Sequence, residues 1–126
     1  MRYVLDSSAI IEILQWTLIG EKIVKLYGSE LLWTTSICLH EIEAGLISQK
    51  EKERWKQIYQ KLSLLPHDEQ GALQSAETYH QLKNKGKMIN ILDILTAGIC
   101  KAHDGNLITL DKDFLNVKDL KVRVIT

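Results

Sequence analysis

The sequence predicts an α/β fold in which a mainly parallel central sheet is flanked by helices on both faces. Short apolar runs typical of buried strands alternate with longer segments whose apolar residues recur at helical spacing. After Leu5 and after Thr34, a strand passes into a helix through polar residues that can cap it. The 126 residues, of which 45% are hydrophobic, suffice for one substantial core, so we expect a single domain over residues 1–126.

The first half of the chain is expected to contain two strand-to-helix units. In order, they comprise a strand at residues 3–5, a helix from about residue 9 with an interruption near Gly20, a strand at residues 31–34 and a helix at residues 36–47. Gly28 ends the first helical region, and Thr35 or Ser36 is the expected N-cap of the second.

The second half is expected to contain three helices and then two strands. In order, these are a helix after Ser48 that carries Trp55, Ile58, Tyr59 and Leu62 and ends before Pro66, a helix from Asp68 to near Gly86, a helix at residues 90–103, a strand at residues 107–110 and a strand at residues 122–126. Ser48 and Glu51 form a capping box. The helix at residues 90–103 is apolar on nearly all sides, so it should lie centrally.

Composition and charge exclude several classes of protein. Sixteen basic and sixteen acidic residues cancel, so any attraction for nucleic acid must come from local patches. Cys38 and Cys100 lack a C-x-x-C spacing, which favours reduced core thiols over a disulfide framework or a zinc site. No apolar run approaches the ~20 residues that cross a bilayer, and no signal-type N-terminus is visible. We therefore expect a soluble cytoplasmic protein with no membrane partner.

Two acidic residues stand at the ends of predicted strands. Asp6 follows the first strand in the stretch YVLDSSAIIEIL, and Asp111 follows the strand LITL. In parallel sheets flanked by helices, binding sites lie beyond the carboxyl ends of the strands. Asp6 also has a simpler interpretation as the N-cap of the next helix, a role that Ser7 or Ser8 could fill as well.

A third acid lies inside a helix that is otherwise apolar. Asp93 is the only acid of NILDILTAGICKAH, and a carboxylate in such surroundings must be paired, protonated or bound to a cation. Small residues three, four and seven positions further along leave room for a ligand to approach that face. The alternative is an ion pair with a lysine such as Lys101 or Lys87.

The fourth acid is expected on the helix at residues 36–47. Glu41 and Glu43 both lie at the margin of its apolar stripe, so helical angle does not choose between them. Gly45 stands one turn after Glu41 and clears space above it, which favours Glu41 and leaves Glu43 as a solvated side chain.

Four converging carboxylates need a partner. Like charges about 5 Å apart repel by a few kcal/mol at an effective dielectric near 20. A hard divalent cation removes this conflict, and an all-oxygen ligand set suits Mg²⁺ or Mn²⁺. The four histidines share no metal-ligand spacing, so zinc is not expected. The acids therefore predict a site for one or two Mg²⁺ or Mn²⁺ ions.

Four segments together resemble the PIN-domain ribonucleases. They are YVLD-S-S near the start, TTSICLHEIEAGL with its glutamate four residues before a glycine, the apolar DILTAGIC, and LITLDKDF near the end. Each motif is weak, but their order and approximate spacing cover essentially the whole chain. In size and layout the chain is most similar to the VapC-type toxins of prokaryotic toxin–antitoxin pairs, and the resemblance implies a PIN-like three-layer fold.

The resemblance also assigns roles to individual residues. The family's four acids, which bind metal and carry catalysis, fall on Asp6, Glu41, Asp93 and Asp111. Ser8 and Thr109 match small polar positions near the metal and before the last acid, and Asp113 stays open as an alternative to Asp111. Gly98 stands where the family often has a second alanine, a departure that concerns packing.

The function that the resemblance implies is Mg²⁺- or Mn²⁺-dependent endonucleolytic hydrolysis of RNA, which leaves a 3′-hydroxyl and a 5′-phosphate. The implied role is the toxin of a type II toxin–antitoxin system, with a cognate antitoxin as partner and homodimerisation. The local cations that could contact the RNA phosphates are Lys83, Lys85, Lys87 and Lys112. The alternative is that these lysines only keep helix ends soluble.

Three alternatives remain. The first is a PIN-like RNA- or protein-binding module without catalytic activity. A haloacid-dehalogenase-type phosphotransferase would need a second Asp two residues after the first, where this chain has Ser8. A phosphoacceptor receiver domain would need an acidic pair at the first strand and an acceptor Asp in mid-chain, and neither is evident.

Overall fold

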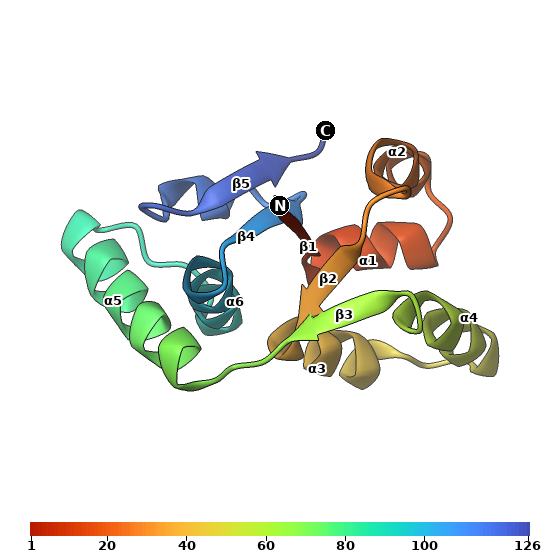
Figure 1. The fold of residues 1–126 in the computed structure, drawn as a ribbon, viewed down its shortest axis with the longest axis horizontal. Helices are drawn as coiled ribbons and strands as arrows, with labels where there is room; N and C mark the ends of the chain where they lie inside the picture. Colours follow the sequence, from red (N-terminus) through yellow and green to blue (C-terminus); the bar gives the residue numbers. More distant parts are fainter.

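A computed structural model describes the whole chain, residues 1–126. Its centre is a five-stranded sheet in which all neighbouring strands are parallel, in the order β3-β2-β1-β4-β5 (Figure 1). The strands are β1 (Arg2–Leu5), β2 (Leu32–Thr35), β3 (Leu62–Leu65), β4 (Gly105–Thr109) and β5 (Lys121–Val124). The helices are α1 (Ser7–Leu14), α2 (Leu18–Tyr27), α3 (Ser36–Gly45), α4 (Gln49–Tyr59), α5 (Glu69–Lys85), α6 (Ile91–Ala102) and the 3-10 helix η1 (Lys112–Asn116).

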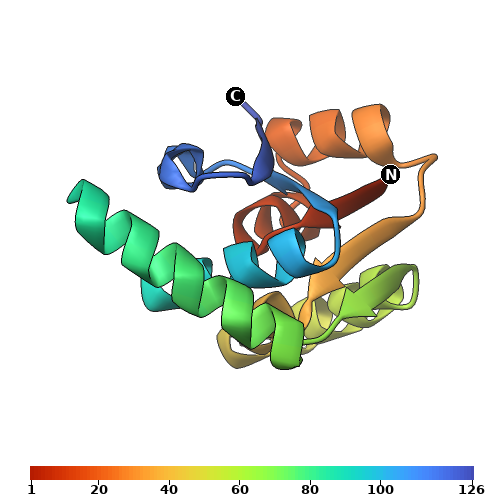
Figure 2. The same ribbon diagram turned by 60° about the vertical axis from the view of Figure 1, so that its left-hand side comes forward.

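Helices cover both faces of the sheet, so the predicted α/β fold with its flanked parallel sheet is confirmed. Successive residues of a strand point to opposite faces, and each face has its own core. Val4 and Leu107 pack with residues of α5 and α6 on one face. Leu5 and Ile108 pack with residues of α1 to α4 on the other. Figure 2 shows the long helix α5 lying along α6 on the outside of the first face.

Helix caps follow the sequence signals closely. Thr35 is the N-cap of α3, Asp68 is the N-cap of α5, and Ser48 with Glu51 forms the predicted capping box of α4. Gly86 ends α5 with a φ of 71°, in the left-handed region that glycine enters without steric cost. Local side-chain chemistry therefore sets most helix ends.

The largest difference from the sequence-based prediction is strand β3. Helical spacing up to Leu62 predicted one helix ending before Pro66, but α4 ends at Tyr59 and Leu62 begins a strand. This strand pairs in parallel with β2, with Leu62 beside Leu32 and Leu65 beside Thr35. The pairing satisfies backbone groups along β2 that a longer helix would leave open, so tertiary structure overrides the local pattern.

The first helical region breaks before Gly20. α1 starts at Ser7 rather than near Ala9, and α2 starts at Leu18, after Thr17 as its N-cap. Gly20 instead lies within α2, where an added Cβ would stand 2.2 Å from the carbonyl oxygen of Glu12, so the glycine lets α2 pack closely on α1. Other bounds shift by a few residues: the helix predicted at residues 36–47 ends at Gly45, and the last two strands each start earlier and end sooner than predicted.

The strand order changes direction at β1. From β1 the chain proceeds outward through β2 to β3, then returns through α5 and α6 to β4 on the other side of β1 (Figure 1). The carboxyl ends of β1 and β4 therefore flank a topological switch point, where open α/β sheets bind ligands. Asp6 follows β1 directly, and Asp111 comes two residues after β4. No helix has the length and apolarity needed to span a bilayer.

Candidate active site at the carboxyl edge of the sheet

Asp6 is almost fully buried at the end of β1. Its Oδ1 accepts hydrogen bonds from the Ala9 amide at 3.0 Å and the Ser8 hydroxyl at 2.7 Å, and its Oδ2 accepts one from the Thr109 hydroxyl at 2.5 Å. Burial raises the pKa of Asp6, the hydrogen bonds oppose that rise, and the charge of Asp111 adds to it. The interpretation of Asp6 as a helix cap is correct. It does not exclude a ligand role, because Oδ2 accepts a single hydrogen bond and retains a lone pair.

Ser8 and Thr109 tie Asp6 to the end of β4. The Ser8 hydroxyl accepts a hydrogen bond from the Leu110 amide at 3.0 Å and lies 3.3 Å from Thr109 Oγ1. Thr109, which is fully buried, also accepts a hydrogen bond from the Asp111 amide at 3.0 Å. One polar network thus joins the ends of β1 and β4 and holds the Asp6 carboxylate in a single orientation.

Glu41 lies half-buried on α3, and its Oε1 accepts a hydrogen bond of 2.7 Å from the Ser7 hydroxyl. Its charge is among those that raise the pKa of Asp93. Glu43 is exposed and lines a surface hollow with Trp55 and Lys56 instead. The structure therefore brings Glu41, and not Glu43, toward the other acids.

Asp93 occupies the first turn of α6 and is half-buried. Burial is the largest cause that raises the pKa of Asp93 to about 6, followed by the charges of Asp111, Glu41, Asp6 and Asp113. The alternative of an ion pair with a lysine is wrong for this structure, because both ion pairs of the chain lie elsewhere. Lys101 donates a hydrogen bond to Thr78 at 3.0 Å instead.

Asp111 and Asp113 differ in exposure and in influence. Asp111 is half-buried and caps η1, with its Oδ1 accepting the Asp113 amide at 2.9 Å. Its charge raises the pKa of both Asp6 and Asp93, whereas Asp113 is exposed and contributes least to the shift of Asp93. This geometry favours Asp111 as the fourth acid and leaves Asp113 at the margin.

The donor set of this edge fits a hard divalent cation, because it consists of carboxylate and hydroxyl oxygens. As the side chains stand, however, no three His, Cys, Asp or Glu side chains form a group that could hold a metal ion. The four acids share one region, since Asp6, Glu41 and Asp111 each raise the pKa of Asp93, but their oxygens do not converge on one point. No ion pair restrains Glu41, Asp93 or Asp111.

Sequence reasoning missed the contact of Ser7, which it considered only as a helix cap. The capping position belongs to Asp6, and this leaves the Ser7 hydroxyl free to reach Glu41. It also missed that the Cys38 thiol, buried on α3, lies 3.7 Å from Thr96 Oγ1 on α6. Two serines directly after a strand-end acid were the visible signal, but nothing local identifies a partner 34 residues away.

The basic residues predicted to contact RNA are all exposed; they are Lys83, Lys85, Lys87 and Lys112. None of them forms an ion pair. Lys83 Nζ lies 6.0 Å from the ring centroid of Tyr79. Exposure is compatible with both interpretations of these lysines, so RNA contact stays a prediction.

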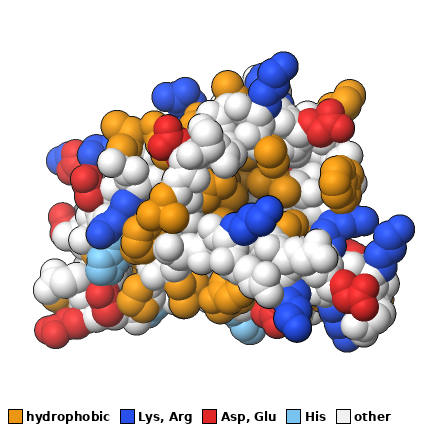
Figure 3. All heavy atoms as spheres, turned by 45° about the vertical axis from the view of Figure 1, so that its right-hand side comes forward, with side chains coloured by type: hydrophobic (Ala, Val, Ile, Leu, Met, Phe, Trp, Pro, Cys, Tyr) orange, Lys and Arg blue, Asp and Glu red, His pale blue; other side chains and the backbone are white.

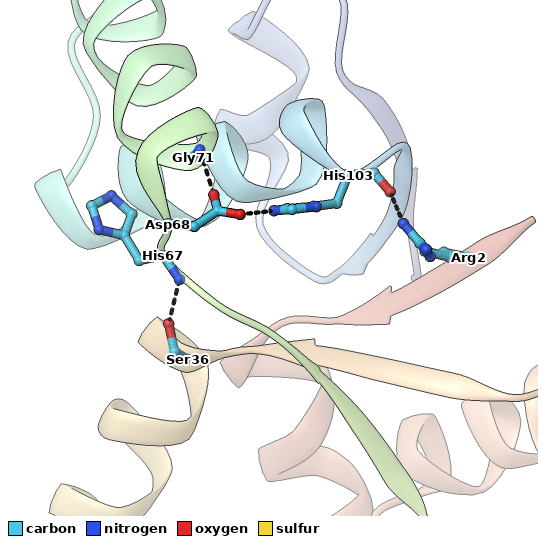
Figure 4. A network of polar contacts seen from close by, with 6 residues as sticks. All are labelled: Arg2, Ser36, His67, Asp68, Gly71 and His103. Carbon is cyan, nitrogen blue, oxygen red and sulfur yellow. Dashed lines mark hydrogen bonds and ion pairs between the residues drawn. The ribbon is translucent and has the colours of Figure 1, made fainter.

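The two ion pairs of the chain, His103–Asp68 and Lys121–Asp104, both lie away from the edge. Figure 4 shows Asp68 between the Gly71 amide, which donates to Oδ1 at 2.8 Å, and His103 Nε2, 3.0 Å from Oδ2. The Gly71 hydrogen bond is the largest cause that lowers the pKa of Asp68. Arg2 in turn donates to the His103 carbonyl at 2.7 Å. The acids of the carboxyl edge have no basic partner.

A groove of about 620 Å³ lies between α1, α2 and α4, away from the acids. Apolar side chains such as Trp16, Val24 and Ile58 line it, together with Arg54 and Lys61. Figure 3 shows this hollowed face, with apolar side chains gathered at its centre and basic side chains close by. Trp16 is 69% exposed, which is unusual for so large an apolar side chain and marks the groove as a candidate contact surface.

Comparison with known proteins agrees with this architecture. The family model described as PIN domain matches residues 3–120. No curated protein matches the chain by sequence. The similarity inferred from the four sequence motifs is therefore confirmed by a family match over nearly the whole chain.

Solved structures similar to the chain come from bacterial VapBC and FitAB-type complexes. A chain of VapBC2 from Rickettsia felis, solved with a DNA fragment from its promoter, is 19% identical with a TM-score of 0.89 and full coverage of both chains. A chain of FitAcB from Neisseria gonorrhoeae is 28% identical with a TM-score of 0.81, covering 97% of this chain and 96% of that one. A chain of VapBC-5 from Mycobacterium tuberculosis, a member of the VapBC family of toxin-antitoxin systems, is 22% identical with a TM-score of 0.71, covering 98% and 97%.

Proposed function

The chain belongs to the PIN domain family, and from this premise we propose that it is a Mg²⁺- or Mn²⁺-dependent endoribonuclease and the toxin of a type II toxin–antitoxin pair. One observation carries the proposal: acids from four separate elements gather without basic partners at the β1–β4 switch point, and burial and mutual repulsion raise the pKa of Asp93 to about 6. Such strain is typical of sites whose charge is balanced by a ligand.

In this proposal the four acids hold the cation, and hydroxyl groups support two of them. Asp6 is fixed by Ser8 and Thr109, and Glu41 by Ser7. Asp93 and Asp111 are half-buried and unpaired, so they can turn toward a shared ligand. A bound divalent ion supplies positive charge against the scissile phosphate and lowers the pKa of a water molecule.

The test is RNA cleavage by the purified chain with Mg²⁺, with Mn²⁺ and with excess chelator. Cleavage is expected with either ion and not with chelator, and sequencing of the product ends should find 3′-hydroxyl and 5′-phosphate groups. A double-stranded DNA substrate serves as the control for substrate class. Cleavage that persists in chelator would overturn the metal-dependent mechanism.

We propose that an antitoxin binds the groove between α1, α2 and α4. Support comes from the exposed apolar lining of the groove and from the similar chains, which belong to VapBC and FitAcB complexes. The partner is expected to bury an apolar segment there and, further along, to set a basic side chain against the acids, since guanidinium groups pair strongly with carboxylates.

Expression of the chain alone should arrest growth of a bacterial host, and co-expression of the antitoxin should relieve the arrest. Val24→Glu places a charge in the groove, because Val24 lines it and is 50% exposed. The variant should still cleave RNA and arrest growth but should resist the antitoxin. Normal neutralisation of Val24→Glu would place the partner elsewhere.

Lys83, Lys85, Lys87 and Lys112 are proposed to contact RNA phosphates, since all four are exposed and unpaired. Replacing one with alanine should weaken RNA binding and lower the steepness of its salt dependence. Homodimerisation and a cytoplasmic location belong to the same proposal.

A second candidate function is a PIN-like module that binds RNA or protein without cleaving it. The observation in its favour is that no three acids form a ready group for a metal ion. Retention of RNA binding together with no cleavage in Mg²⁺ or Mn²⁺ would select this candidate.

A further inference from the structure

Ser7 links the two helices that follow β1 and β2. It is the first residue of α1, directly after Asp6, and its hydroxyl donates to Glu41 Oε1 on α3 at 2.7 Å. This is the one hydrogen bond that the Glu41 side chain makes, and no cation pairs with it. The orientation of Glu41 therefore depends on a single neutral donor.

The Ser7 hydroxyl does not cap helix α1. The N-cap of α1 is Asp6, whose Oδ1 accepts the Ala9 amide. Ser7 is half-buried, and it is among the groups that oppose the burial-driven rise in the pKa of the Cys38 thiol, which lies buried on α3. The side chain thus faces inward between α1 and α3.

Contact with Ser7 leaves the other Glu41 oxygen available. Oε2 accepts no hydrogen bond from the protein, while the hydroxyl restrains Oε1. A glutamate on a helix has several free torsions, and a single donor that restrains one oxygen reduces the freedom lost when the other binds a ligand. Groups that hold a ligating carboxylate in this manner tune metal affinity.

We infer that Ser7 is a positioning residue for Glu41, setting the carboxylate for cation binding at the carboxyl edge; this inference rests on the proposed function. Ser7 acts through Glu41 alone, since it touches no other acid of the site through a hydrogen bond. Its contribution should therefore vanish when Glu41 no longer carries a carboxylate.

The experiment is a double-mutant cycle read out by Mn²⁺ binding, with electron paramagnetic resonance of free Mn²⁺ as the measurement. Ser7→Ala should weaken Mn²⁺ binding by about tenfold, the lower end of the range for groups that hold metal ligands. In a Glu41→Gln background, Ser7→Ala should change binding by less than about twofold, because the group it positions is gone. Ser7→Thr retains the hydroxyl and should restore binding.

Ser36→Ala is the matched control. Ser36 is also on α3, and its hydroxyl accepts the His67 amide at 3.0 Å and forms no hydrogen bond with any of the four acids (Figure 4). It should alter thermal stability without altering Mn²⁺ binding, which separates a loss of stability from a loss of positioning.

Three outcomes would overturn the inference. If wild type binds Mn²⁺ and Ser7→Ala binds it equally well, Ser7 positions nothing and the proposed function stands. If Ser7→Ala weakens binding equally with Glu41 and with Gln at position 41, the effect is structural. If wild type neither binds Mn²⁺ nor cleaves RNA, the proposed function fails and this inference fails with it.

Discussion

Helix α6 has an acidic residue at each end, and the two residues have different electrostatic environments. Asp93, in its first turn, has no basic partner, and burial together with four other acids raises its pKa to about 6. Asp104, just beyond its last turn, accepts a hydrogen bond from Lys121 at 2.7 Å, and this contact is the largest cause that lowers the pKa of Asp104. Folding therefore neutralises charge at one end of α6 and concentrates it at the other.

The difference between the two ends shows where the fold contains unfavourable electrostatic interactions. Asp68, like Asp104, has partners that favour its ionised form. Asp93, Asp111, Glu41 and Asp6 lie in one region, and no basic side chain pairs with any of them. Repulsion between carboxylates therefore lowers the stability of the fold at the carboxyl edge, and a bound cation would reduce that repulsion.

The largest expected effect is on cleavage. Three variants each remove a carboxylate with little change of shape: Asp6→Asn, Glu41→Gln and Asp93→Asn. Mutation of a residue that only holds a metal ligand can lower activity by up to roughly 100-fold, so loss of a ligand itself should lower the rate of metal-dependent cleavage by at least that factor. Initial rates on a labelled RNA measure the loss. Glu43→Gln should cleave normally, because Glu43 is exposed and points away from the group. An inactive Glu43→Gln with an active Glu41→Gln would reverse the assignment.

The next effect concerns the support of Asp6. Thr109→Val keeps the shape of a fully buried side chain but removes the hydroxyl that donates to Asp6 and accepts the Asp111 amide. The free energy of unfolding at neutral pH should fall by about 1.5–3 kcal/mol, the usual contribution of a hydrogen bond to a charged group. Urea denaturation measures it, and an unchanged midpoint would show that the network does not stabilise the fold.

A smaller effect of opposite sign is expected at Asp93. Its folded pKa of about 6 exceeds the unfolded value of 3.8, so between these values the folded chain binds more protons, and stability falls as pH rises. In chelator at neutral pH, Asp93→Asn should therefore be more stable than wild type by about 1–2 kcal/mol, after allowance for solvent screening of a half-exposed group.

The pH dependence gives the check on that sign. The advantage of Asp93→Asn should be complete above pH 6 and should disappear as the pH is lowered toward 4, where wild-type Asp93 is protonated. Added Mn²⁺ should raise the melting temperature of wild type more than that of the variant. A variant that melts below wild type in chelator would indicate an unrecognised partner for Asp93.

The smallest effect is expected at the other end of α6. Asp104→Asn breaks an ion pair whose side chains are 79% and 60% exposed, and such surface pairs contribute little. Cleavage should equal that of wild type, and the thermal midpoint should hardly move. A loss of cleavage activity in Asp104→Asn would contradict the conclusion that only the Asp93 end of α6 takes part in catalysis.

The contrast also shows how far sequence reasoning reached. Asp6, Asp93 and Asp111 could be identified because each interrupts or terminates an apolar segment, a local and visible anomaly. Glu41 needed a weak argument from Gly45, and its contact with the Ser7 hydroxyl was not visible in the sequence. Its role as a metal ligand stays a prediction. The absence of a lysine partner for Asp93 could not be predicted, because a partner could come from any element that folding brings beside α6.

The sequence by itself determined the alternation of strands and helices, most helix caps and the acids at strand ends, since these depend on residues within a few positions of one another. Tertiary structure decided that Leu62–Leu65 is a strand, because its partner in β2 lies about thirty residues away. It also joined Thr109 to Asp6 and Ser7 to Glu41, contacts across 103 and 34 residues. Such contacts form when the sheet brings distant strand ends to one edge, and no short stretch of sequence records them.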